Sequence, residues 1–162
     1  MAGRQVLTRE NTFTDELQRA VEKEFRGIHI TYDEVYYLDY EVDEETGMIN
    51  RQVLVEHYTK EQTARNLKAM KSAYLVEKGA VSPAEIINFR KKYNIAASVL
   101  SLILGFSKIT ISNIENEGIT SLPSGRFIRL VLKDRSLLAE YVGYCTTLEE
   151  KKKKELLEKL MV

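Results

Sequence analysis

The stretch from Ser82 to Gly118, SPAEIINFRKKYNIAASVLSLILGFSKITISNIENEG, decides the fold of the second half of this chain. It begins with Ser82-Pro83-Ala84-Glu85, which combines a serine cap, a proline at the first helical position and a glutamate at the third. This start predicts a helix that ends near Asn94, a residue type that tolerates left-handed backbone.

Two shorter helices are expected in the same stretch. The first covers residues 96–104 and ends at Gly105, and the second runs from about Ser107 to Glu115, before Gly118. Small residues at the junction let two helices pack at a steep angle, as a helix-turn-helix requires. A plain helical hairpin in an all-α domain has the same spacing and is the alternative.

The individual residues favour the helix-turn-helix. The stretch resembles the repressor-like (XRE-type) helix-turn-helix of the MqsA/YgiT-type antitoxin family, with one residue inserted before the last glycine. The resemblance covers residues 28–135 and is weaker upstream, where the family also has a small sheet-containing domain and a helix. The positions that match the family pattern are Ser82, Pro83, Glu85, Ile86, Arg90, Tyr93, Leu104, Gly105, Thr110, Ile111, Glu115 and Gly118.

This resemblance implies a DNA-binding transcriptional repressor that acts on its own operon and neutralises a toxin protein. The chain departs from the family at two places. Family members hold zinc with cysteine pairs in the N-terminal domain, whereas this chain has no cysteine before Cys145, so we expect an apolar core instead of a metal. The family also favours a glutamine and an arginine where this chain has Ala97 and Asn113.

Five polar residues of the motif are candidates for DNA contact. Lys108, Thr110 and Asn113 belong to the helix that would enter the major groove, where lysine reads guanine or contacts phosphate and asparagine suits adenine. Ser98 and Ser107 are expected near phosphates.

The apolar character of residues 96–104 supports a second hypothesis. A half-buried helix needs a polar face, but Val99, Leu100, Leu102, Ile103 and Leu104 leave little room for one. Apolar area left outward would mark a protein contact surface. The alternative function is therefore a non-catalytic protein-interaction module, an inhibitor or adaptor whose degenerate helix-turn-helix binds no specific operator. We favour DNA binding.

Residues 1–80 are expected to form a small α+β domain that carries the partner surface. The first ten residues show no periodicity and are expected to fray. Leu17, Val21 and Phe25 fall at i, i+4 and i+8, which predicts a short helix that ends at Gly27.

A sheet and its covering helix are expected next. Residues 28–58 alternate between apolar and polar side chains and are rich in tyrosine, which predicts an antiparallel meander of two or three strands. Such a sheet needs cover on one face. Thr59 and Gln62 form a capping box that predicts a covering helix near residues 60–78.

The C-terminal part is predicted to be helical. Pro123-Ser124 opens one helix, and Thr147 with Glu150 is expected to cap an amphipathic last helix. The buried face of that last helix would be formed by Leu148, Leu156 and Leu160. The tail EEKKKKELLEKL, residues 149–160, has two interpretations: a solvated helix that lies on the domain, or a helix that docks on a second subunit. We expect a homodimer, because two subunits suit a helix-turn-helix that reads paired half-sites.

Charge supports a division of the chain. Its 24 basic and 24 acidic residues cancel, but residues 1–80 carry net −4, residues 81–135 carry net +4 and residues 136–162 are neutral. A uniformly basic coat is excluded, and the basic surface must be local to the helix-turn-helix.

Catalysis, metal binding and membrane insertion find no support in the sequence. One cysteine with His29 and His57 is too small a set for a zinc centre, and phosphate loops and catalytic triads are missing. No apolar run reaches roughly 18 residues. We therefore expect a soluble cytoplasmic protein without catalytic residues, metal or cofactor, whose partners are operator DNA and a toxin or other protein.

The sequence thus predicts an α+β fold. A small antiparallel sheet with helices (residues 1–80) is followed by an all-α repressor-like helix-turn-helix domain (residues 81–135) and a C-terminal helix (residues 136–162).

Overall fold

The computed structural model describes residues 3–162 and confirms a mixed α+β fold. It divides the chain into two compact units, residues 1–70 (unit 1) and residues 71–162 (unit 2). The boundary lies ten residues earlier than the sequence indicated, inside a continuous helix. Residues 136–162 fall within unit 2.

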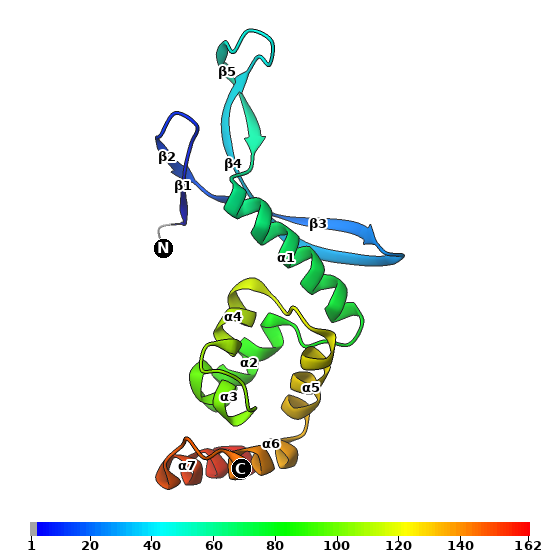
Figure 1. The fold of residues 1–162 in the computed structure, drawn as a ribbon, viewed down its shortest axis with the longest axis vertical. Helices are drawn as coiled ribbons and strands as arrows, with labels where there is room; N and C mark the ends of the chain where they lie inside the picture. The colour runs from blue at the N-terminus through cyan, green and yellow to red at the C-terminus, as the bar shows by residue number, and fades with distance from the viewer. Residues whose placement is uncertain (1–2) are drawn as a thin grey trace. The chain divides into compact units, whose positions relative to one another are not determined.

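Unit 1 contains five strands and the first part of that helix (Figure 1). The strands are β1 (Gln5–Leu7), β2 (Phe13–Asp15), β3 (Leu17–Phe25), β4 (Ile28–Val42) and β5 (Ile49–His57), and the helix is α1 (Lys60–Glu77). Unit 2 contains α2 (Pro83–Tyr93), α3 (Ala97–Ile103), α4 (Thr110–Glu117), α5 (Leu122–Lys133), α6 (Arg135–Tyr144) and α7 (Glu150–Met161).

The long strand β4 organises unit 1, because it has a different partner along each half. Its first half pairs antiparallel with β3, from Phe25↔Ile28 to Leu17↔Tyr36. Its second half pairs with β5 from Tyr37 onward, with a shift in register between Tyr40 and Glu41. The antiparallel strands predicted over residues 28–58 are therefore confirmed as the pair β4 and β5. The third strand of the sheet, β3, precedes that range, and the strand order is β3-β4-β5.

The helix predicted over Leu17–Phe25 is wrong, because these residues form β3. A spacing of i, i+4 and i+8 fits the two-residue period of a strand as well as the helical period. Arg19 and Lys23 lie between the apolar residues on the same face. Arg19 is held there by Glu34 of β4, 3.1 Å from its guanidinium.

The expectation that the first ten residues fray is also wrong for the part that the structure describes. Gln5–Leu7 pairs antiparallel with Phe13–Asp15 in a hairpin. The hydroxyls of Thr8 and Thr12 share a hydrogen bond of 2.7 Å across its loop. Local polar contacts of this kind leave no hydrophobic period in the sequence.

The predicted capping box of α1 is confirmed. Thr59 Oγ1 accepts from the Gln62 backbone N–H, and Gln62 Oε1 accepts from the Thr59 N–H, both at 3.0 Å. The same glutamine donates through Nε2 to Glu16 at 3.0 Å, and Arg65 donates to that carboxylate at 2.8 Å. Further along α1, the side-chain amide of Asn66 pairs with both backbone groups of Val35 in β4. Polar contacts therefore anchor the helix that covers the sheet.

Acid is expected to destabilise unit 1 through Glu16. Burial alone would raise the pKa of this carboxyl, but hydrogen bonds from Arg65 and Gln62 outweigh it and leave the pKa below the ordinary 4.5. A carboxyl with a depressed folded-state pKa stabilises the fold above its unfolded pKa and loses that contribution as pH falls through the folded one. We expect Glu16→Gln to be less stable at pH 7 and to have a flatter stability profile below pH 4.5. Urea unfolding in a pH series measures this, and parallel profiles for the two proteins would contradict it.

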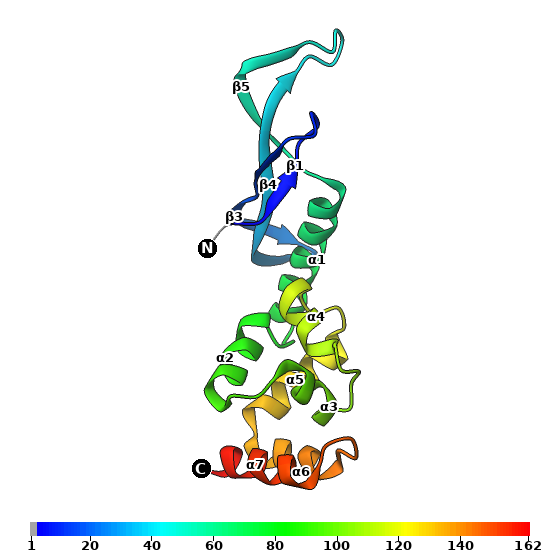
Figure 2. The ribbon, with the colours of Figure 1, turned by 90° about the vertical axis from the view of Figure 1, so that its left-hand side faces the viewer.

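A single hydrophobic core holds unit 2 together, and every helix from α2 to α7 contributes to it. Fully buried members include Ile86, Leu100, Ile111, Ile128, Leu138 and Leu156. The helix pair α6 and α7 lies against the other helices (Figure 2). Within unit 2, α6 contacts α3 and α5, and α7 contacts α6.

This packing corrects the expectation of an apolar surface on α3. Leu100, Ile103 and Leu104 are buried, and Val99 and Leu102 are partly buried against the same core. The excess of apolar residues exists because α3 has neighbours on several sides, α4 and α6 among them. It therefore does not indicate a partner surface.

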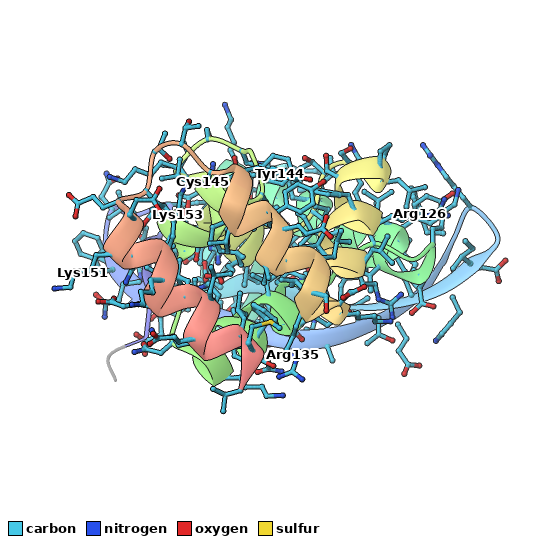
Figure 3. All side chains as sticks on the ribbon, turned by 90° about the horizontal axis from the view of Figure 1, so that it is seen from below. Arg126, Arg135, Tyr144, Cys145, Lys151 and Lys153 are labelled. Atoms are coloured by element: carbon cyan, nitrogen blue, oxygen red, sulfur yellow. The ribbon has the colours of Figure 1, made fainter. Side chains whose placement is uncertain are left out.

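The last helix starts differently from the prediction. Glu149, not Thr147, occupies the cap position of α7, and no side chain caps it there. Thr147 lies 3.3 Å from the Cys145 sulfur instead. Leu156 and Leu160 are buried as expected, and α6 lies alongside α7 (Figure 3). The apolar face of the tail is thus covered by the chain itself.

Two helical glycines offer a matched stability test. A Cβ on Gly125 of α5 would overlap the Ala80 side chain and lie 3.1 Å from Ile119, whereas a Cβ on Gly143 of α6 would meet nothing within 4 Å. We expect Gly125→Ala to destabilise unit 2 by about 1–3 kcal/mol through overpacking. Gly143→Ala should stabilise it by about 0.5–1 kcal/mol through helix propensity. Urea unfolding monitored by circular dichroism separates the two, and shifts of the same sign would contradict this packing.

Candidate nucleic-acid interface

The helices α3 and α4, joined by residues 104–109, occupy the stretch for which a helix-turn-helix was predicted. Ser101 ties them together from a fully buried position. Its hydroxyl donates to the Ala97 carbonyl and accepts from the backbone N–H of Ile111, each at 2.9 Å. One of the free N–H groups in the first turn of α4 is thereby satisfied.

An ion pair fixes α4 against α2. Arg90 donates to the two carboxylate oxygens of Glu115 at 2.6 and 2.8 Å, and also to the carbonyl of Ile95 at 3.1 Å. The side chains are 24% and 11% exposed, so the pair is largely shielded from water. The bond to Glu115 raises the pKa of Arg90 above its ordinary value. Both residues belong to the pattern quoted above, and the structure shows that they contact each other.

The outward face of α4 is a stripe formed by Ile109, Asn113 and Asn116, at i, i+4 and i+7. All three are exposed, and Ile109 is 61% exposed. The opposite face carries the buried Ile111 and Ile114. The sequence prediction missed Ile109 and Asn116, although their spacing from Asn113 could have revealed them.

The predicted residues do not all lie together. Asn113 and Thr110 line one shallow groove with hydroxyl side chains at the start of α5, namely Thr120, Ser121 and Ser124. One carboxylate, Glu117 at the end of α4, lines the same groove. Ser107 lies beside this groove, because its hydroxyl shares a hydrogen bond of 2.9 Å with that of Thr110.

The other two predicted residues stand apart from that groove. Lys108 is exposed just before α4, and within residues 3–162 it makes no hydrogen bond or ion pair. Ser98 is half-buried in the first turn of α3 and does not line the groove. The term α4 face is used for three parts together: the stripe of Ile109, Asn113 and Asn116, the neighbouring Lys108, and the groove beside Thr110.

The two units carry opposite charge. Residues 71–162 contain 15 Lys/Arg and 10 Asp/Glu, which gives net +5, and residues 1–70 contain 9 and 14, which gives net −5. Several cations of unit 2 have intramolecular partners, for example Arg126, which donates to the Lys78 carbonyl at 2.8 Å. The cation left to solvent beside α4 is Lys108.

No group of three or more His, Cys, Asp or Glu side chains within residues 3–162 is placed to hold a metal ion. None of the helices described here has the length and apolar character needed to cross a bilayer.

The chain matches no family model, and no curated protein or solved structure is significantly similar to it. The resemblance to the antitoxin family therefore rests on the residues quoted above, and a function must be argued from the α4 face and from unit 1.

Proposed function

We propose that this chain is a DNA-binding transcriptional regulator of antitoxin type, which represses its own operon and binds a partner protein. The observation that carries the proposal is the α4 face. The helix α4 is short and is held against α2 by the Arg90–Glu115 ion pair. Amide, apolar and cationic side chains of the α4 face are exposed to solvent. A helix held in this way can place its exposed side chains at base edges in the major groove.

The chemistry of the stripe indicates the kind of sequence that is read. Asparagine side chains make paired hydrogen bonds to adenine, and an exposed isoleucine contacts the methyl group of thymine. Asn113, Asn116 and Ile109 together favour A·T base pairs. Lys108 contributes a contact to guanine or phosphate at the entry to α4.

The hydroxyls of the groove suit the DNA backbone. Thr120, Ser121 and Ser124 lie where α5 begins, next to Asn113. Hydroxyl side chains and backbone N–H groups commonly bind phosphate oxygens and fix the register of a protein on the duplex. A homodimer would read two such half-sites about one helical turn apart.

The partner protein would bind unit 1. In the hairpin of β4 and β5, apolar side chains of β5 are exposed, including Leu54 at 57%, and β5 pairs only with β4 among the described strands. Exposed apolar patches and unpaired strand edges are common protein-contact surfaces. Four further apolar or aromatic residues in or beside β5 are exposed, and they fall on both faces of the hairpin because successive strand side chains alternate: Met48, Ile49, Val53 and Tyr58.

Selection from a random duplex library tests the proposal without any assumption about the operator. The natural chain is expected to enrich an A·T-containing motif repeated with two-fold symmetry. Failure to enrich any motif would contradict sequence-specific binding and favour the alternative, an interaction module that contacts only proteins.

A further inference from the structure

A second charged feature of unit 2 lies at the junction of α2, α3 and α7. A groove there is lined by four cationic side chains and, among the described residues, by no carboxylate. The cations are Arg90, Lys91, Lys152 and Lys159. This feature is named the basic groove.

The four cations differ in the intramolecular partners that they have. Arg90 is paired with Glu115. Lys159 donates at 3.1 Å to the Asn94 carbonyl, at the C-terminal end of α2, where the helix dipole favours a cation. Lys91 and Lys152 make no hydrogen bond or ion pair within residues 3–162.

This concentration of charge is not explained by the fold. Lys153, one residue further along α7, has Glu150 at 3.5 Å. In the basic groove, by contrast, Lys91, Lys152 and Lys159 line one groove whose described lining contains no carboxylate. Like charges held close together repel, and a bound anion relieves that repulsion.

The position of the groove suggests which kind of anion it would bind. Ile95 and Ala96 form part of its wall, so the groove borders the first turn of α3, the first helix of the helix-turn-helix. In such motifs the first helix crosses the DNA backbone while the second lies in the major groove. We propose that the basic groove binds DNA backbone phosphates beside the base pairs read by α4, with Lys152 and Lys159 of α7 as the added contacts. This inference rests on the proposed function.

The test compares two double variants of equal charge on α7. Lys152→Ala with Lys159→Ala removes two of the four groove cations, the two that α7 contributes. Lys151→Ala with Lys154→Ala removes two exposed cations outside the groove, and Lys151 extends away from the helix pair (Figure 3). Each lost phosphate contact lowers the slope of log K against log salt by about 0.9 and weakens binding several-fold at physiological salt. We expect the groove variant to lose about 1.8 in slope and about tenfold or more in affinity on any duplex, with its sequence preference unchanged.

The outcomes separate this inference from the proposed function. If the natural chain prefers its operator but both double variants lose the same slope, the groove binds no phosphate and the regulator proposal stands. If the natural chain shows no sequence preference, the regulator proposal fails, and the slopes on unrelated duplex still decide whether the groove binds a backbone. The single variant Lys152→Ala removes no intramolecular bond, so a loss of slope there cannot come from misfolding.

Discussion

Replacing Arg90 with alanine is expected to lower the free energy of unfolding of unit 2 by about 3 kcal/mol, since removal of one partner leaves a largely buried charge uncompensated. Glu115, whose side chain is 11% exposed beside Arg90, would lose its cation, and the Ile95 carbonyl would lose its donor. The loss also releases α4 from α2, so operator binding should weaken together with stability. Urea unfolding of the full chain, followed by far-ultraviolet circular dichroism, measures the change.

A double variant controls for the loss of packing. Arg90→Met combined with Glu115→Leu removes both charges and fills the space with apolar side chains, a replacement that is often neutral in stability. We expect it to recover most of the stability that Arg90→Ala loses. An unchanged unfolding midpoint for Arg90→Ala would show that the ion pair does not hold α4 in place.

Replacing Asn113 with alanine is expected to reduce operator affinity by about 10- to 100-fold, because a good paired contact between a side chain and a base contributes about 1–3 kcal/mol of discrimination. The loss should be confined to one base pair of each half-site: on DNA changed at that pair, the variant and the natural chain should bind equally. Fluorescence anisotropy with a set of single-substitution duplexes measures this.

Two further variants separate base recognition from other effects. Asn88→Ala removes an exposed amide from α2, away from the α4 face, and should leave affinity unchanged. Lys108→Ala should weaken binding to all duplexes, and if its contact is to phosphate it should lower the salt slope by about 0.9. Equal losses for Asn113→Ala and Asn88→Ala would contradict recognition through α4.

The starts of α1 and α2 could be predicted from the sequence because their capping is local. At Thr59–Gln62 and Ser82–Glu85 the paired hydrogen bonds involve residues only three positions apart. Asn94 adopts the left-handed conformation (φ 49°) that was expected at the end of α2. In each case the chemistry that ends or begins a helix lies within one turn of it.

Other elements could not be predicted because their signals are ambiguous or non-local. The spacing of Leu17, Val21 and Phe25 fits two periods, and only the pairing of β3 with β4 decides between them. Between α5 and α6 the chain has a single residue, Asp134, which caps α6 by accepting from the N–H groups of Ser136 and Leu137. Because neither glycine nor proline occurs at this junction, the sequence prediction did not separate α5 from α6.

The same contrast between local and non-local signals explains why only part of the candidate site was predicted. The motif indicates where its second helix begins, and this was enough to select Lys108, Thr110 and Asn113 as candidate DNA contacts. Exposure of Ile109 depends on how α4 packs, and burial of Val99 and Leu102 depends on neighbours that include α6. Such facts become visible only when the whole core is assembled.

The central claim is that the α4 face reads a DNA sequence, and the most direct test is binding to the DNA upstream of its own gene. Affinity for that duplex and for a scrambled duplex of equal composition should be measured across a salt series, for the natural chain and for Lys108→Ala with Asn113→Ala. The natural chain should prefer the upstream duplex by about 1,000-fold or more at physiological salt, as specific regulators do, and the double variant should lose most of that preference. Equal affinity of the natural chain for both duplexes would contradict the claim.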